Sequence, residues 1–185
     1  MKNTKYLLST IIALTVTSLS QYSFGRVIIC KCGYIKLWQG VTFSSENSQH
    51  ISDWYSFSHI IHGFGFYYFG KLFLKKLSLL QVFLIALTIE AGWEILENTS
   101  FIINRYRETT ISLDYYGDSI LNSSFDVLFM VLGFYMAKKL PVWAIIFLTI
   151  AMELATGYII RDNLALNILM IVRPVEAVKR WQTGI

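Results

Sequence analysis

Four long apolar segments follow residue 53, and they restrict the possible folds more than any other feature of the chain. They run from about Trp54 to Leu74, Leu77 to Leu96, Ser119 to Ala137 and Leu140 to Ile160. Each has about 20 residues, which is enough for a helix to cross a hydrocarbon core about 30 Å thick. A segment in lipid must be helical, because every backbone group needs a partner within it. The pattern therefore predicts an all-α, polytopic membrane helix bundle.

The composition agrees with a membrane setting. Of the 185 residues, 55% are hydrophobic and 15% are charged, whereas soluble domains contain about 25% charged residues. The formal net charge of +4 is small, and it is carried by short loops rather than by a basic patch. We therefore expect membrane lipids as partners and no nucleic acid, and association into a homo-oligomer stays open.

The two ends of the chain extend this bundle. Residues 1–20 carry early lysines and then an apolar run, which is typical of an anchor helix or a cleavable signal peptide. With an anchor helix the chain has about five transmembrane helices, and a sixth stays open. The segment from Leu164 to Val172 is too short to span and predicts an interfacial C-terminal helix. A single membrane domain over 1–185 would then comprise the anchor, a loop at 21–53, a four-helix core at 54–160 and a tail at 161–185.

Lysines distinguish one side of the predicted bundle. The N-terminus and the loops at 71–76 and 138–139 would share this side, and they contain no acidic residue. Their basic residues are Lys2, Lys5, Lys71, Lys75, Lys76, Lys138 and Lys139. The positive-inside rule places this side in the cytoplasm, with the N-terminus, and the loop at 21–53 on the other side. The side of the C-terminal tail stays open.

Polar residues within the apolar segments are expected to gather at the opposite, extracytoplasmic face. They occur at the start of one segment and the end of the next, and antiparallel helices bring such positions together. The groups are His59 and His62; Glu90, Glu94 and Glu97; Asp114, Asp118, Asn122 and Asp126; and Glu153 with Arg161, Asp162 and Asn163. Spacings of three or four residues place each of the first three groups on one helix face. A charged side chain at mid-bilayer costs about 2.5–3.5 kcal/mol, so this set predicts a functional cavity or a structural polar network.

Two kinds of chemistry suit these residue types. Histidines and carboxylates bind zinc, iron or manganese, so the candidate ligands of a divalent transition metal are His59, His62, Glu90 and Glu94. No H-E-x-x-H motif supports this hypothesis. Crowded carboxylates also serve as acid and base, and the candidate catalytic residues are Glu94, Glu90, His62 and Asp126. The candidate substrate-binding residues are Arg105, Arg107, Arg161, Asp118 and Asn122, since guanidinium groups suit phosphate headgroups.

Three functions are compatible with this pattern. The first is an enzyme that acts on a lipid or lipid-linked envelope substrate. The second is a proton- or cation-coupled transporter or a lipid-headgroup-binding module, although no polar track leads to the lysine side. The third is a membrane scaffold in which the polar residues only hold helices together.

Two local expectations concern the loops. Cys30 and Cys32 are separated by one residue, so we expect no easy disulfide and at most a metal or redox role. Asp118 stands where a helix N-cap is expected. The segment between Glu97 and Asp118 is expected to be a loop. As an alternative to a functional role, loop ion pairs near the headgroups are expected among Glu97, Arg105, Arg107, Asp114, Arg161 and Asp162.

Several long motifs resemble an uncharacterised, domain-of-unknown-function family of bacterial multi-pass membrane proteins. They are Cys30-Lys31-Cys32-Gly33, Asn47 to Tyr55, Ser58-His59-Ile60-Ile61-His62-Gly63, Glu90 to Asn98, Asp114 to Ser119, Leu140-Pro141-Val142-Trp143 and Arg161-Asp162-Asn163-Leu164. The similarity extends from about Gly25 to Gln182. It implies a bacterial inner-membrane protein and no particular activity.

The chain is more distantly similar to VanZ-like membrane proteins, which are linked with glycopeptide-antibiotic resistance. The correspondence would involve His59 or His62, then Glu94 with Glu97, then Asp126 with Gly133. Glu97 stands in place of that family's glutamine, and Met130 in place of its asparagine. The resemblance implies no specific reaction.

Overall fold

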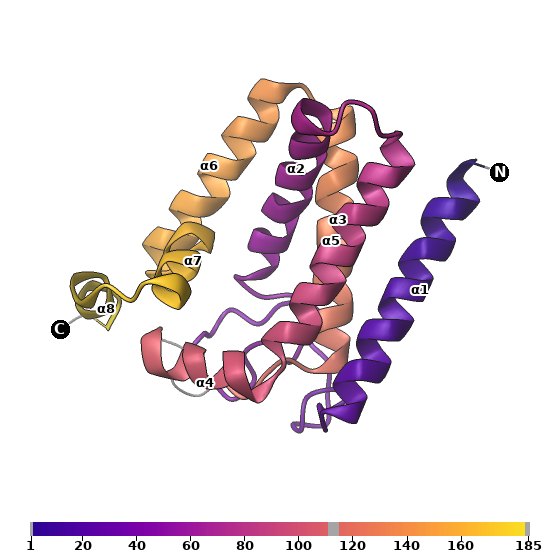
Figure 1. Cartoon of the computed structure of the whole chain (residues 1–185). Helices are drawn as coiled ribbons and strands as arrows, with labels where there is room; N and C mark the ends of the chain where they lie inside the picture. Colours follow the sequence, from indigo (N-terminus) through magenta and orange to yellow (C-terminus); the bar gives the residue numbers. More distant parts are fainter. Residues whose placement is uncertain (1, 111–114, 184–185) are drawn as a thin grey trace.

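The computed structural model describes residues 2–110 and 115–183, which form α-helices joined by loops. The helices are α1 (Lys2–Ser23), α2 (Ser56–Phe73), α3 (Leu79–Glu97), α4 (Ser100–Thr109), α5 (Ile120–Lys139), α6 (Val142–Ile159), α7 (Leu164–Val172) and α8 (Glu176–Thr183) (Figure 1). An isolated bridge between Gln39 and Asp53 adds a short extended contact. The prediction of an all-α chain is confirmed.

Three helices among the described residues are long and apolar enough to cross a membrane, which is fewer than the five predicted. They are α3, α5 and α6. The helices α1 and α2 have 22 and 18 residues, so length is not what separates them. Polar residues lower their hydropathy: α1 begins with two lysines and is rich in serine and threonine, and α2 contains His59 and His62.

Helices α2, α3 and α5 form the centre of the bundle, with α1 packed on α3 and α5 and with α6 beside α2 and α5 (Figure 1). The short helix α4 lies across one end, near the long loop that joins α1 to α2. The ends of α2 and α5, with Lys71 and Lys139, lie at the opposite end near the start of α1. The expected grouping of lysines at one end of the bundle is therefore present.

Two glycines allow α2 and α5 to touch through their backbones. A Cβ atom on Gly63 would overlap the carbonyl oxygen of Met130, and one on Gly133 would overlap the carbonyl oxygen of Ile60. Small residues permit this kind of close approach between helices in membranes. Both helices start at the same end of the bundle (Figure 1), and the contact fixes the first half of α2 against the middle of α5.

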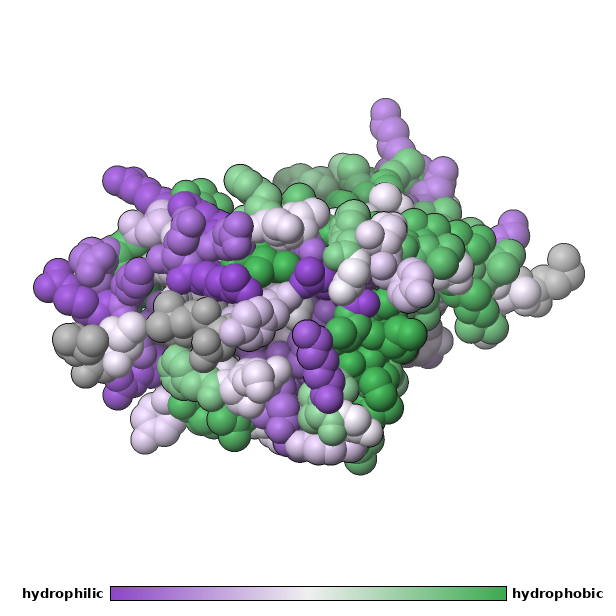
Figure 2. All heavy atoms as spheres, turned by 90° about the horizontal axis from the view of Figure 1, so that it is seen from below, coloured by the Kyte–Doolittle hydropathy of each residue, from purple (hydrophilic) through white to green (hydrophobic). Residues whose placement is uncertain are grey.

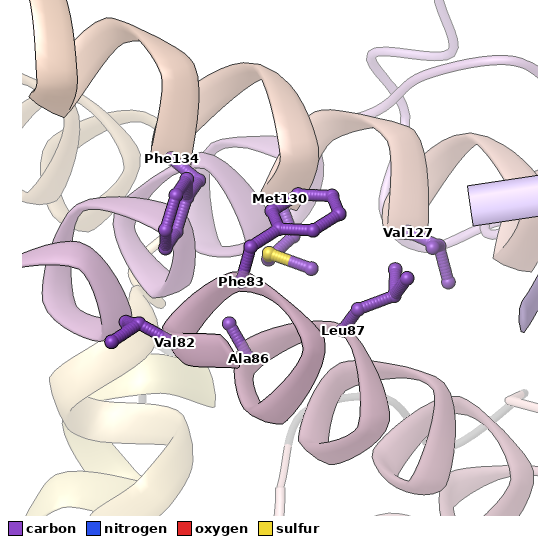
Figure 3. Packing of buried hydrophobic residues seen from close by; sticks show 7 residues of the cluster. All are labelled: Val82, Phe83, Ala86, Leu87, Val127, Met130 and Phe134. Carbon is purple, nitrogen blue, oxygen red and sulfur yellow. The ribbon is translucent and has the colours of Figure 1, made fainter. Parts of the chain in front are cut away.

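An apolar layer fills the half of the bundle nearer the lysines. It consists of Val82, Phe83, Ala86 and Leu87 of α3 packed against Val127, Met130 and Phe134 of α5 (Figure 3). Val127 and Met130 are fully buried. The buried polar residues of α2, α3 and α5 are thus confined to the other half.

The long loop before α2 provides hydrogen-bond acceptors for the start of α5. The backbone N–H groups of Ser119, Ile120 and Leu121 donate to carbonyl oxygens of that loop at 2.8–3.0 Å. The Ser119 hydroxyl accepts from the backbone N–H of Asn122 at 3.1 Å. These N–H groups have no partner within the helix. Ser119 is therefore the N-cap, and the expectation that Asp118 caps the helix is wrong.

Three further differences from the expectations are local. Residues Ser100–Thr109 form α4 rather than a loop. Glu153 accepts from the backbone N–H groups of Leu164 and Ala165 at the start of α7, next to the N-cap Asn163. Cys30 and Cys32 form a disulfide, contrary to expectation. A turn at Gly33, with φ of 82°, accompanies a Cα–Cα separation of 5.1 Å, which is within the range for disulfides.

Seen from the end that carries α4 and the long loop, the molecule has two kinds of surface (Figure 2). Hydrophilic side chains gather on the side where α8 lies, and apolar side chains predominate toward α1. The flank of α6 is also apolar, because Trp143, Phe147 and Tyr158 are exposed. Such exposed apolar flanks are expected of helices surrounded by lipid.

Candidate functional site

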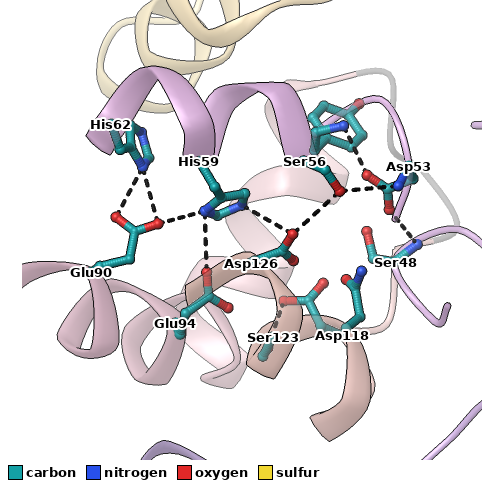
Figure 4. A network of polar contacts seen from close by, with 12 residues as sticks. Ser48, Asp53, Ser56, His59, His62, Glu90, Glu94, Asp118, Ser123 and Asp126 are labelled. Atoms are coloured by element: carbon teal, nitrogen blue, oxygen red, sulfur yellow. Dashed lines mark hydrogen bonds and ion pairs between the residues drawn. The ribbon is translucent and has the colours of Figure 1, made fainter. Parts of the chain in front are cut away.

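Helices α2, α3 and α5 bring five of the predicted polar residues together beyond the apolar layer (Figure 4). We call this set the central cluster: His59 and His62 of α2, Glu90 and Glu94 of α3, and Asp126 of α5. Glu90 lies between the two histidines, with His59 Nδ1 at 2.6 Å from Oε1 and His62 Nδ1 at 3.1 Å from Oε2. An ionised carboxylate only accepts, so an ionised Glu90 selects the tautomer with hydrogen on Nδ1 in both imidazoles.

Glu94 is the least satisfied member of the central cluster. Its side chain is 1% exposed, and neither carboxylate oxygen has a hydrogen-bond partner. The nearest basic atom is His59 Nδ1, at 3.5 Å from Oε1. Buried carboxylates are ordinarily hydrogen-bonded, paired or bound to a metal.

Asp126 faces the other nitrogen of His59. Its Oδ1 lies 3.9 Å from His59 Nε2 and accepts a hydrogen bond from the Ser56 hydroxyl at 3.4 Å. If His59 donates from Nδ1 to Glu90, then Nε2 presents a lone pair. Two acceptors therefore face each other across a gap where a cation or a proton fits.

Asn98 organises a neighbouring carboxylate that belongs to the same site. Its amide nitrogen donates to Asp118 Oδ2 at 2.8 Å, and its oxygen accepts from the backbone N–H of Asp118 at 2.7 Å. Tyr115 donates to Asp118 Oδ1 at 2.9 Å. Burial raises the pKa of Asp118, while the donors from Asn98 and Tyr115 oppose that shift. Asn98 was not among the predicted site residues, although it belongs to the Glu90–Asn98 motif.

The site opens into a cavity of about 400 Å³. One wall is polar and includes His59, His62, Glu90, Asp118 and Asp126. The other wall is apolar and consists of Phe66, Ile89, Trp93, Leu164, Ile168, Ile171 and Val172. Sequence reasoning did not find this second wall, because α7 reaches it only through tertiary packing.

The three arginines proposed for phosphate binding do not line this cavity. Their side chains donate to backbone carbonyl oxygens instead: Arg105 to Ile171 at 2.9 Å, Arg107 to Tyr115 at 2.6 Å and Arg161 to Trp181 at 3.2 Å. Asn122 donates to the carbonyl oxygen of His50 at 2.9 Å and is also directed elsewhere. Asp114 lies outside the described residues. Substrate binding by these side chains stays a prediction.

Three overlapping groups of side chains near the cavity lie close enough together to bind a cation. The ligand atoms of each set lie within 4.8 Å of one another, and the sets are His59, Glu94 and Asp126; His59, His62 and Glu90; and Glu94, Glu97 and Asp118. A fourth set, Cys30, Cys32 and His50, lies in the long loop. Its sulfur atoms are joined in a disulfide, so they do not offer thiolates.

Asp162 is a buried carboxylate near the cavity. It accepts from the Tyr55 hydroxyl at 3.2 Å, the Gln182 amide at 3.1 Å and the backbone N–H of Asn163 at 3.0 Å. It has no measurable exposure. Burial raises the pKa of Asp162 from 3.8 to about 6.

We expect this carboxylate to make stability fall with rising pH. A raised pKa means that the folded protein holds the proton more tightly, so the stabilising contribution is complete below about pH 4 and is lost as pH rises through about 6. Asp162→Asn should therefore flatten the fall of Tm between pH 4 and 7 in detergent. An unchanged pH profile in the variant would contradict the assignment of this effect to Asp162.

Comparison with known proteins places the chain in a family. The model of the family described as protein of unknown function DUF2585 matches residues 21–184. A UPF0314 protein of Rhizobium etli (strain CIAT 652) is 53% identical over 97% of this chain and 92% of its own length. A UPF0314 protein of Paracoccus denitrificans is 51% identical, over 96% and 92% respectively.

No solved structure matches the chain significantly. The relation to VanZ-like proteins stays a prediction. The family match and the bacterial relatives agree with the first resemblance drawn from the motifs between Gly25 and Gln182. The chain therefore belongs to the DUF2585 family, a family of proteins of unknown function.

Proposed function

We propose that this protein is a bacterial inner-membrane enzyme that hydrolyses a lipid or lipid-linked envelope substrate at the central cluster, with the help of a divalent transition metal. The observation that carries the proposal is the Glu94 carboxylate, which is buried without a hydrogen-bond partner beside His59 and Asp126. A site built only to hold helices together would leave no buried carboxylate unpaired.

The ligands we assign to the metal are His59 Nε2, Asp126 and one oxygen of Glu94. Ligand atoms at about 2.0–2.2 Å from a metal such as zinc lie about 3–4 Å from one another. The separation of 3.9 Å between His59 Nε2 and Asp126 Oδ1 fits this range. Glu90 holds the opposite nitrogen of His59 at 2.6 Å, which is the usual way in which a carboxylate orients a metal-binding histidine.

A bound metal supplies two functions in hydrolysis: it polarises the bond under attack and lowers the pKa of a bound water. His62 is suited to the proton transfers, because Glu90 orients its Nδ1 and its ring lines the cavity. It would take a proton from the attacking water as the new bond to oxygen forms. It would return that proton to the leaving oxygen when the substrate bond breaks.

The apolar wall of the cavity supports a lipid as the substrate. Its outer residues are open to the surroundings, since Ile89 is 51% exposed, Ile168 52% and Val172 75%. An acyl or isoprenoid chain could lie against this wall while its polar group reaches the central cluster. The three helices that are long and apolar enough to span a membrane support a position of the cavity mouth next to lipid.

The cluster is expected on the extracytoplasmic side. The lysines at the ends of α2 and α5 lie at the opposite end of the bundle, and the positive-inside rule directs that end and the N-terminus to the cytoplasm. The apolar layer between the two ends favours a site open on one face over a transport pathway.

The metal content of the detergent-purified protein tests the proposal. We expect wild type to retain zinc, iron or manganese, Glu94→Gln to lose it, and Glu108→Gln to behave as wild type, because Glu108 is exposed on α4. Liposomes of bacterial polar lipid extract would then be screened by lipid mass spectrometry for a lipid that is consumed only by the metal-loaded protein. Folded wild-type protein that binds none of these metals when they are added back would refute the metal site.

A further inference from the structure

We infer that the cavity holds two cations bridged by the carboxylate of Glu94, the second of them bound by Glu97 and Asp118. This inference rests on the proposed function, because it extends the same site. It also narrows the substrate class to a phosphate ester of a lipid.

The geometry gives two ligand sets that share one side chain. Glu94 belongs to the set with His59 and Asp126 and also to the set with Glu97 and Asp118. In both sets all ligand atoms lie within 4.8 Å of one another. A carboxylate that belongs to two sets is the usual bridge in paired metal sites, where the ions lie about 3.5–4 Å apart.

The second, independent observation is that both oxygens of Glu94 lack a hydrogen-bond partner. The side chain is 1% exposed, and neither Oε1 nor Oε2 accepts a hydrogen bond. A single ion bound through one oxygen, together with His59 and Asp126, would leave the other oxygen buried and unpaired. A bridging position satisfies both.

Charge leads to the same conclusion. The described lining of the cavity includes five acidic residues: Asp53, Glu90, Glu97, Asp118 and Asp126. It includes two histidines and no lysine or arginine. Glu94 adds a sixth carboxylate behind this wall. With all six carboxylates ionised, one divalent cation would leave most of this negative charge uncompensated, and buried charges are ordinarily paired or bound to metals.

The two positions differ in ligand chemistry. The first offers an imidazole nitrogen and carboxylates, which suit zinc, iron or manganese. The second offers only carboxylates, which suit manganese, magnesium or calcium. Manganese suits both positions and is therefore the appropriate probe.

A phosphate ester is the substrate class that such a pair would serve. The predicted phosphate-binding arginines are directed to backbone carbonyls, so cations are the positive charges available to a phosphate in the described cavity. Two-metal sites stabilise both the attacking and the leaving oxygen of a displacement at phosphorus. The water oxygen bonds to phosphorus, the bond from phosphorus to the lipid alcohol oxygen breaks, and that oxygen takes a proton.

Manganese titration of chelator-treated, full-length protein in detergent tests the inference. We expect about two Mn²⁺ per chain, with an electron paramagnetic resonance spectrum that shows magnetic coupling between them. Glu97→Gln should retain about one ion with an uncoupled six-line spectrum, since only the second position is impaired. Glu108→Gln should retain two coupled ions.

Each other outcome has a defined meaning. One uncoupled ion in wild type, with no change in Glu97→Gln, would overturn the second cation and leave the proposed function intact. Two uncoupled ions would overturn the bridge through Glu94. No bound manganese, zinc or iron in folded wild type would overturn this inference together with the proposed metal site. The wild-type spectrum decides between these outcomes even if a variant fails to fold.

Discussion

Replacing Gly133 with alanine is expected to destabilise the protein by about 3 kcal/mol or more. The new methyl group would overlap the backbone of Ile60 on α2, and a backbone carbonyl cannot move aside as a flexible side chain can. The helices α2 and α5 would have to separate, and the contact between the first half of α2 and the middle of α5 would open. The measurement is the midpoint of thermal unfolding in detergent, together with the yield of monodisperse protein.

Gly65 provides the matched control on α2. A Cβ atom there meets nothing within 4 Å, so Gly65→Ala should be neutral or should stabilise the helix by about 0.5–1 kcal/mol. Gly63→Ala should resemble Gly133→Ala, because its Cβ would overlap the carbonyl of Met130. Equal midpoints for Gly133→Ala and Gly65→Ala would show that α2 and α5 do not touch as described.

Replacing Asn98 with alanine should cost about 3 kcal/mol. Its side chain donates to Asp118, Ser123 and the carbonyl of Glu94, and accepts from the backbone of Asp118. Asn98 is 1% exposed, so water cannot readily replace these bonds. A buried group that loses its partner costs about 1–3 kcal/mol, and more when it is charged. Thermal unfolding in detergent measures the loss.

Two further variants make this second prediction specific. Asn104 lies exposed on α4, so Asn104→Ala should change the midpoint little. Asn98→Asp keeps the shape but replaces the amide donor with a second carboxylate facing Asp118, and it should be as harmful as Asn98→Ala near neutral pH. If Asn98→Ala unfolds at the wild-type midpoint, the hydrogen-bond network around Asp118 does not contribute to stability.

Much of the site was predictable because helical spacing acts locally. His59 and His62 share one face of α2, and Glu90 and Glu94 share one face of α3, as their spacings of three and four residues require. The expectation that these faces meet required only that successive helices run in opposite directions. The structure confirms that the two helix faces lie next to each other, because Glu90 contacts both histidines.

Other features of the site could not be predicted from the local sequence. Asn98 and Ser119 have no periodic signal, since their roles depend on backbone groups supplied by distant segments. The roles of the arginines also depend on other segments of the chain. Arg105 and Arg107 lie near the site in sequence, but their guanidinium groups donate hydrogen bonds to backbone carbonyl oxygens. The hydrophobic pattern also overestimated the number of apolar spanning helices, because α1 and α2 combine helical length with polar residues.

The sequence by itself determined the helical class, the helix faces that carry histidine and carboxylate, and the grouping of lysines at one end. These follow from hydrophobic length and from the period of the helix, which are local properties. The tertiary structure alone decided that Gly63 and Gly133 join α2 to α5, that α7 supplies an apolar wall, and that Glu94 lacks a hydrogen-bond partner. The physical reason is that backbone contact, cavity shape and hydrogen-bond satisfaction depend on which distant segments meet in space.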